Sequence, residues 1–151
     1  MLVGDGASGQ QGVALFQTSI LVRFGDLDAA GIAYYPRIFN MCHVAFEEMW
    51  EKFIGRTYAS LILDEKLGMP LVHAEADFFA PLEYGAAIAI RVGVAKLGSK
   101  SVKFQFDFFR ADDRLHLARI RLTNAMVNMR TFRSVKISAT YRDWFERLMK
   151  S

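Results

Sequence analysis

Residues 36–55 read PRIFNMCHVAFEEMWEKFIG, and this stretch decides the fold. Its apolar side chains recur at helical spacing and cover most of the circumference, which leaves only a narrow polar stripe. Pro36 suits the first turn of a helix, and Gly55 suits its end. The sequence therefore predicts a long helix over about residues 37–54 that other structure must surround.

Strand patterns, in which apolar and polar side chains alternate, lie on both sides of this helix. One comes before it, at Ile20–Phe24, and four follow it, at Leu71–Phe79, Ile88–Val94, Val102–Phe108 and His116–Met129. Shorter helices are expected at about Thr57–Lys66 and Tyr141–Met149. Short turns between strands are typical of an antiparallel sheet. The pattern predicts an α+β fold in which a curled antiparallel sheet covers one long central helix.

Composition indicates a single domain. The chain has 151 residues, 52% of them hydrophobic, with 13 phenylalanines, which is enough for a substantial core. Residues 1–15 are rich in Gly, Ser and Gln and lack the pattern of a signal peptide, so we expect a disordered tail before a domain at 16–151. No apolar run approaches a membrane span, and Cys42 is the only cysteine. We expect a cytoplasmic protein that does not enter a membrane.

The net charge of +3 is only mildly basic, and no recognised nucleic-acid motif accompanies it. A polyanionic small ligand is at least as good an explanation, so no nucleic-acid partner is expected. No two histidines have metal-ligand spacing, and neither a metal nor a cofactor is predicted.

The loop before the helix reads FGDLDAAGIAYYP over residues 24–36, with two carboxylates between glycines. A carboxylate beside a helix start stays ionised, because free N–H groups and the helix dipole favour negative charge there. The same N–H groups can polarise a substrate carbonyl, a pairing that suits acyl transfer. Asp28 is the first candidate for this chemistry, although an aspartate here can also simply cap a turn. Asp26 is expected to hold the loop by accepting backbone hydrogen bonds.

This loop, Phe-Gly-Asp-x-Asp-x-Ala-Gly-Ile followed by two aromatic residues and a proline, resembles the signature of the 4-hydroxybenzoyl-CoA thioesterase family. The resemblance extends more weakly from about Ser19 to Phe145. It implies a hotdog fold and hydrolysis of an acyl-CoA, in which coenzyme A is part of the substrate rather than a cofactor. It also implies a homodimer or homotetramer with active sites at the subunit boundary.

The resemblance assigns roles within the loop. It makes Asp28 the catalytic carboxylate, as nucleophile or as general base, and makes the backbone amide of Tyr35 the donor to the oxyanion. Gly31 and Tyr34 would contact the substrate. Tyr35 followed by Pro36 is typical of the branch that acts on aromatic acyl-CoA. A small aromatic acyl group of the benzoyl or hydroxybenzoyl kind is therefore expected.

Four further residues are assigned to substrate binding on the same basis. His43 occupies the helix position at which the aryl-CoA type carries an acid near the ring hydroxyl. Lys100, Ser101 and Arg133 match positions that hold the nucleotide of coenzyme A.

Three alternatives stay open. The enzyme could act on short aliphatic acyl-CoA or on acyl carrier protein, or the domain could bind acyl-CoA and regulate other proteins without catalysis. Another branch of hotdog enzymes uses a helix glutamate, which would point to Glu47 or Glu48, but that branch lacks the aspartate loop.

Overall fold

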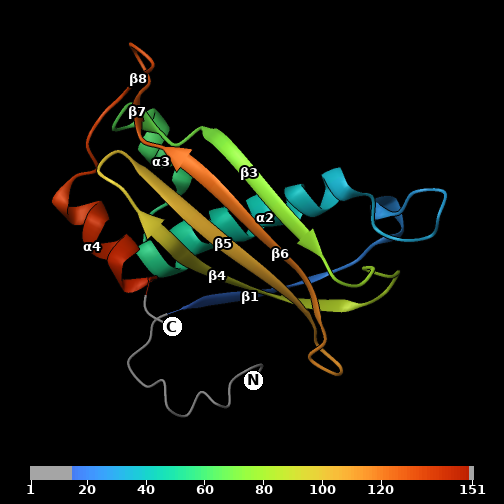
Figure 1. Ribbon diagram of the computed structural model, residues 1–151. Coiled ribbons are helices and arrows are strands. Elements are labelled where there is room, and N and C mark those ends of the chain that lie inside the picture. Colours follow the sequence, from blue (N-terminus) through green and yellow to red (C-terminus); the bar gives the residue numbers. More distant parts are fainter. Residues whose placement is uncertain (1–14, 150–151) are drawn as a thin grey trace.

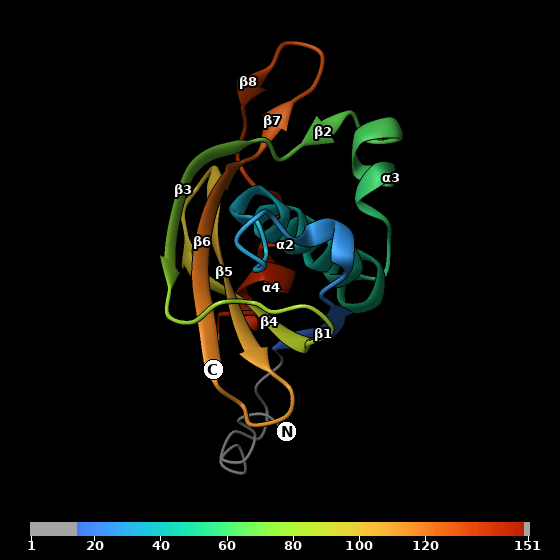
Figure 2. The ribbon, with the colours of Figure 1, turned by 90° about the vertical axis from the view of Figure 1, so that its right-hand side faces the viewer.

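The computed structural model describes residues 15–149, so the tail predicted at 1–15 lies almost wholly outside the described residues. One five-stranded antiparallel sheet forms one layer, in the order β1-β4-β5-β6-β3. Its strands are β1 (Phe16–Leu21), β3 (Leu71–Phe78), β4 (Ala87–Leu97), β5 (Ser101–Arg110) and β6 (His116–Ala125). The helices lie together on one side of this sheet (Figures 1 and 2). The predicted α+β architecture, a curled sheet around one long helix, is confirmed.

The central helix is α2 (Tyr35–Met49), and a π-helical turn at Trp50–Ile54 extends it to Gly55. Its buried side chains face the apolar side of the sheet, where three phenylalanines of β5 are also buried: Phe104, Phe106 and Phe108. Gly55 has a φ of +93°, a left-handed conformation that ends the helix at little steric cost. The predicted bounds of this helix are therefore close to those observed.

Two strand predictions were wrong in their bounds. β1 runs from Phe16 to Leu21, and Phe24 lies instead in a 3₁₀ turn (Phe24–Asp26) that begins the loop. The last long strand ends at Ala125. At Met126 the chain changes partners, because the Met126 N–H still donates to the carbonyl of Lys100 while the Met126 carbonyl accepts the N–H of Val135. After this break the chain forms β7 (Val127–Asn128), which pairs with β2 (Leu67–Gly68) and β8 (Arg133–Ser134) in a small second sheet.

Two short helices close the apolar layer, α3 (Tyr58–Leu63) and α4 (Ala139–Arg147). Tyr141 of α4 is 4% exposed, and its hydroxyl donates to the Glu65 carboxylate at 2.5 Å. The Arg56 guanidinium contacts both groups, at 2.9 Å from the tyrosine oxygen and 2.5 Å from the carboxylate. Burial and the neighbouring Glu65 raise the pKa of Tyr141 to about 12. This cluster fastens α4 to the segment around α3.

We expect Tyr141→Phe to lower the free energy of unfolding by about 1–2 kcal/mol, because it removes a donor to a charged acceptor. The folded state holds the Tyr141 proton up to about pH 12, whereas an unfolded tyrosine releases it near 10, so wild-type stability should fall across this window. Urea unfolding at pH 7 and pH 11 measures both effects. Tyr84→Phe, at an exposed position, is the control. It should change neither the free energy of unfolding at pH 7 nor the loss of stability between pH 7 and pH 11. Equal behaviour of the two variants would contradict the role of the cluster.

Candidate active site

The loop between β1 and α2 is organised by Asp26, whose side chain is almost completely buried. One carboxylate oxygen accepts the backbone N–H of Arg23 at 2.9 Å, and the other accepts the Nε of Arg37 at 3.1 Å. The Asp26 carbonyl also accepts the N–H of Tyr34 at 2.8 Å. These bonds tie the end of the first strand to the start of α2. The structural role predicted for Asp26 is confirmed.

Asp28 caps the tip of this loop and keeps one oxygen free. Its Oδ1 accepts the N–H of Ala30 at 2.8 Å, and its carbonyl accepts the N–H of Gly31 at 3.0 Å. Gly31 completes the turn at a φ of +84°, a conformation that side chains disfavour. Within residues 15–149, the Oδ2 atom of Asp28 has no hydrogen-bond or ion-pair partner. The carboxylate therefore caps a turn and also presents a free oxygen.

The start of α2 offers one free N–H group. Pro36 has no N–H, and the N–H groups of Arg37 and Ile38 donate to the carbonyl of Tyr34 at 2.8 and 3.4 Å. The N–H of Tyr35 has no acceptor in the described part of the chain. It lies at the positive end of the helix dipole, where a negatively charged oxygen is favoured.

Asp28 and Tyr35 line the same open pocket, of about 510 Å³. Its other walls are mainly apolar and come from the loop, from α2 and from the segment that follows β3: Ile32, Ala33, Ile38, Phe78, Phe79, Ala80, Pro81 and Leu82. Sequence reasoning did not identify Phe78 and Phe79. The signal was present, because two adjacent phenylalanines at the end of a strand cannot both face the core.

The other predicted site residues do not all gather here. Gly31 and Tyr34 belong to the same loop as Asp28. His43 lies two turns further along α2, roughly 12 Å from Tyr35 at 1.5 Å per residue. Lys100, Ser101 and Arg133 lie at the opposite end of the sheet. There Ser99 accepts the N–H of Ile137, which joins the β4–β5 turn to the segment after β8.

His43 lines a second cavity, of about 320 Å³, between α2, α3 and the sheet. Its Nε2 lies 2.7 Å from Glu47, and its ring stacks on Phe46. Tyr58 also lines this cavity, and burial raises the pKa of its hydroxyl, which keeps it protonated at neutral pH. Burial likewise raises the pKa of the Cys42 thiol, so this cysteine is no nucleophile.

The helix glutamates are engaged elsewhere. Glu47 pairs with His43, and Glu48 accepts the hydroxyl of Thr18 and lies 3.6 Å from Lys52. Neither lines the pocket that contains Asp28.

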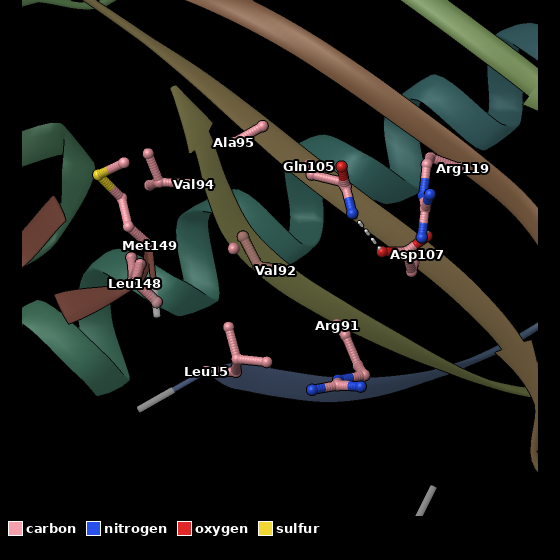
Figure 3. Close-up of a pocket in the computed structure, with 11 residues that line it drawn as sticks. Leu15, Arg91, Val92, Val94, Ala95, Gln105, Asp107, Arg119, Leu148 and Met149 are labelled. Carbon is pink, nitrogen blue, oxygen red and sulfur yellow. Dashed lines mark hydrogen bonds and ion pairs between the residues drawn. The ribbon is translucent and has the colours of Figure 1, made fainter. Parts of the chain in front are cut away.

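A polar hollow of about 460 Å³ lies on the outer face of the sheet (Figure 3). Its carboxylate, Asp107, accepts the Nε2 of Gln105 and the Nε of Arg119, both at 2.8 Å, and His116 lies at the same distance. Because these partners occupy both oxygens, the group is poorly placed to attack a substrate.

Among residues 15–149, no three His, Cys, Asp or Glu side chains gather where they could hold a metal ion. None of the helices in this range could span a membrane.

This chain is similar in sequence and fold to known thioesterases. A 1,4-dihydroxy-2-naphthoyl-CoA hydrolase of Prochlorococcus marinus (strain MIT 9211) is 28% identical over 130 residues, which cover 82% of this chain and 85% of the relative. The structure of a gentisyl-coenzyme A thioesterase matches with a TM-score of 0.75 at 28% identity, over 84% of this chain and 99% of that one. A thioesterase-superfamily structure from Jannaschia sp. CCS1 matches with a TM-score of 0.83 at 24% identity, over 91% and 95%.

Fold and relatives together define a thioester hydrolase with the hotdog fold. The chain belongs to the Thioesterase-like superfamily, whose family model matches residues 22–145. The narrower assignment to the 4-hydroxybenzoyl-CoA branch stays a prediction.

Gly31 provides a test of the loop. We expect Gly31→Ala to destabilise the protein by about 1 kcal/mol, because a side chain is strained at this φ although nothing crowds it. Turnover should fall about tenfold as Asp28 shifts. Gly25→Ala is the matched control, since Gly25 is equally uncrowded and has no positive φ. Thermal unfolding and thiol release measure the two effects, and a Gly31→Ala enzyme with normal turnover would show that the turn does not position the carboxylate.

Proposed function

We propose that this protein hydrolyses an aromatic acyl-CoA to the free acid and coenzyme A. One observation carries the proposal: a free carboxylate oxygen on Asp28 and the free N–H of Tyr35 belong to residues that line one pocket. Hydrolysis of a thioester requires few other groups. Its thiolate leaves readily, and the N–H stabilises the negative charge on the carbonyl oxygen.

Asp28 has two possible roles. As a nucleophile, its oxygen bonds to the thioester carbonyl carbon, the C–S bond breaks, and the thiolate leaves with the electron pair; water then cleaves the resulting anhydride. As a general base, it takes a proton from the water that attacks the carbonyl. Both routes place negative charge on the carbonyl oxygen, where the Tyr35 amide would donate.

An aromatic acyl group fits the surroundings of these two residues. Phe78 and Phe79 are exposed apolar side chains beside Asp28, and flat aromatic rings pack well against such walls. The named relatives act on dihydroxynaphthoyl-CoA and gentisyl-CoA, which both carry aromatic acyl groups. His43 and Tyr58 supply polar atoms to the second cavity, which shares no lining residue with the pocket that contains Asp28.

The basic residues assigned to the nucleotide are too far from Asp28 to serve the same site. The loop packs at the Ala87 end of β4, since Val22 donates its N–H to the carbonyl of Ala86. Lys100 follows the other end of this eleven-residue strand, roughly 30 Å away at 3.3 Å per residue. The arm between the sulfur and the first phosphorus of coenzyme A extends only roughly 16 Å. A second subunit would have to supply the cations.

The free edge of β3 is where we propose that two copies pair. β3 ends the strand order, and its exposed apolar side chains include Leu71, Val72 and Phe78. Unpaired apolar edges favour association. Antiparallel pairing about a two-fold axis would set Phe78 of one copy beside Leu71 of the other. The cationic end of each copy would then lie next to the Asp28 loop of its partner.

Asp28→Asn should lower kcat by about 10²–10⁴-fold, because the amide is neither a base nor a nucleophile. The measurement is thiol release from benzoyl-CoA, a hydroxylated benzoyl-CoA, butyryl-CoA and an acyl carrier protein thioester. Asp112→Asn, in an exposed turn, is the control and should be as active as wild type. A preference for butyryl or carrier-bound substrate would overturn the aromatic assignment. Full activity of Asp28→Asn would remove Asp28 from the mechanism.

Shared sites predict complementation between variants. Arg133→Ala should raise the KM for acyl-CoA, and Asp28→Asn should be inactive. When the two are co-expressed, a mixed dimer has one site with both residues intact, so its activity at low substrate should exceed the average of the parents. Activity equal to that average would show that both residues act within one chain.

A further inference from the structure

The hairpin between β7 and β8 carries an exposed phenylalanine at its tip. Figures 1 and 2 show this hairpin projecting beyond the main sheet, at the end away from the Asp28 loop. Phe132 is 64% exposed and has a φ of +59°, a conformation that favours glycine. Within residues 15–149 its ring contacts no other aromatic ring. Solvent exposure of the ring and the positive φ both make phenylalanine unfavourable at this position. A contribution to folding stability therefore does not explain why it is present.

The turn that presents Phe132 is well ordered by hydrogen bonds. The Asn128 side chain accepts the N–H groups of Arg130 at 2.8 Å and Thr131 at 3.3 Å, and the Asn128 carbonyl accepts that of Phe132 at 2.6 Å. Arg133 closes the turn by pairing with Asn128 in the small sheet. The ordered turn therefore exposes Phe132 close in sequence to Arg130 and Arg133.

The surroundings of this tip are strongly cationic. Six cations lie at this end of the molecule and form no ion pair with a carboxylate of residues 15–149: Lys66, Lys96, Lys100, Arg130, Arg133 and Lys136. Lys96 even lies directly opposite Lys103 in the sheet, an arrangement of like charges that costs stability. Such a surplus is suited to a ligand with several phosphates.

We propose that Phe132 stacks on the adenine of the coenzyme A bound in the partner's active site, while Arg130 and Arg133 contact its phosphates. An aromatic face binds a base by stacking, and arginines bind phosphate oxygens through paired N–H groups. The inference rests on the proposed function, since it names the residues that would recognise the nucleotide half of that substrate.

The test compares a full substrate with one that lacks the nucleotide. Phe132→Gly should raise the KM for benzoyl-CoA about tenfold with little change in kcat, which corresponds to the loss of one stacked base. The benzoyl thioester of N-acetylcysteamine, which has no nucleotide, should be hydrolysed as by wild type. The thermal midpoint should not fall, because glycine relieves the strain at this position.

Matched variants separate stacking from other effects. Phe132→Tyr keeps a ring and should keep the wild-type KM, and Arg130→Ala should raise the KM and weaken its dependence on salt. Leu63→Ala removes an equally exposed apolar side chain at the same end. It should change neither the KM for benzoyl-CoA nor the dependence of this KM on salt. An unchanged KM in Phe132→Gly, or an equal loss for both substrates, would overturn the proposal.

Calorimetric titration with coenzyme A measures binding without hydrolysis. It therefore tests the stacking contact even if the proposed hydrolytic function is wrong. If wild type hydrolyses no thioester yet binds coenzyme A, weaker binding by Phe132→Gly would still support the stacking contact. Equal binding by the two proteins would overturn it. Absence of binding to wild type would overturn it as well.

Discussion

One helix, α2, has a broad apolar face that has to be buried, and a single sheet covers most of that face. The sheet curls around α2 and so contacts more of its apolar surface, because a flat sheet would cover only one stripe of the helix. Three phenylalanines of β5 fill the concave side. Tyr58 of α3 packs against Phe46 of α2, and Tyr141 of α4 packs against Trp50 of the π-helical turn. One face of α2 stays exposed along its length, at Asn40, His43 and Glu47, and the start of the helix is open as well. There the Asp26 carboxylate, and not apolar packing, fixes how the chain enters the helix.

The sequence was sufficient where the determining interactions are local. Pro36 and Gly55 mark the ends of the long helix because their backbone restrictions act on adjacent residues, whatever the rest of the chain does. The loop from Asp26 to Tyr35 could likewise be predicted as a unit. Most of its hydrogen bonds join residues no more than eleven positions apart, and the bond from the N–H of Ala33 to the carbonyl of Leu82 is the long-range exception.

Prediction failed where long-range contacts decide. Alternation alone could not show that strand pairing stops at Leu21 or that the last strand changes partners at Met126, where Val135 begins to pair. Nor could it place Lys100 and Arg133 relative to Asp28, because this depends on which end of β4 meets the loop. The Phe78–Phe79 pair indicated that one of the two rings is exposed. It did not indicate that this ring lies beside the Asp28 loop, because that contact is long-range.

The exposed aromatic residues within residues 15–149 lie near the Asp28 loop, except Phe132 at the opposite end, and the proposed dimer would explain this separation. Phe78, Phe79 and Tyr35 surround the carboxylate at one end, and Phe132 stands among cations at the other. In a lone chain the aromatic side chains near Asp28 form an exposed apolar surface, which favours association. Antiparallel pairing along β3 would bring one group of each copy next to the opposite group of its partner. The residues for thioester hydrolysis and those for nucleotide binding would then lie at opposite ends of each subunit, and only dimerisation would bring them together in one site.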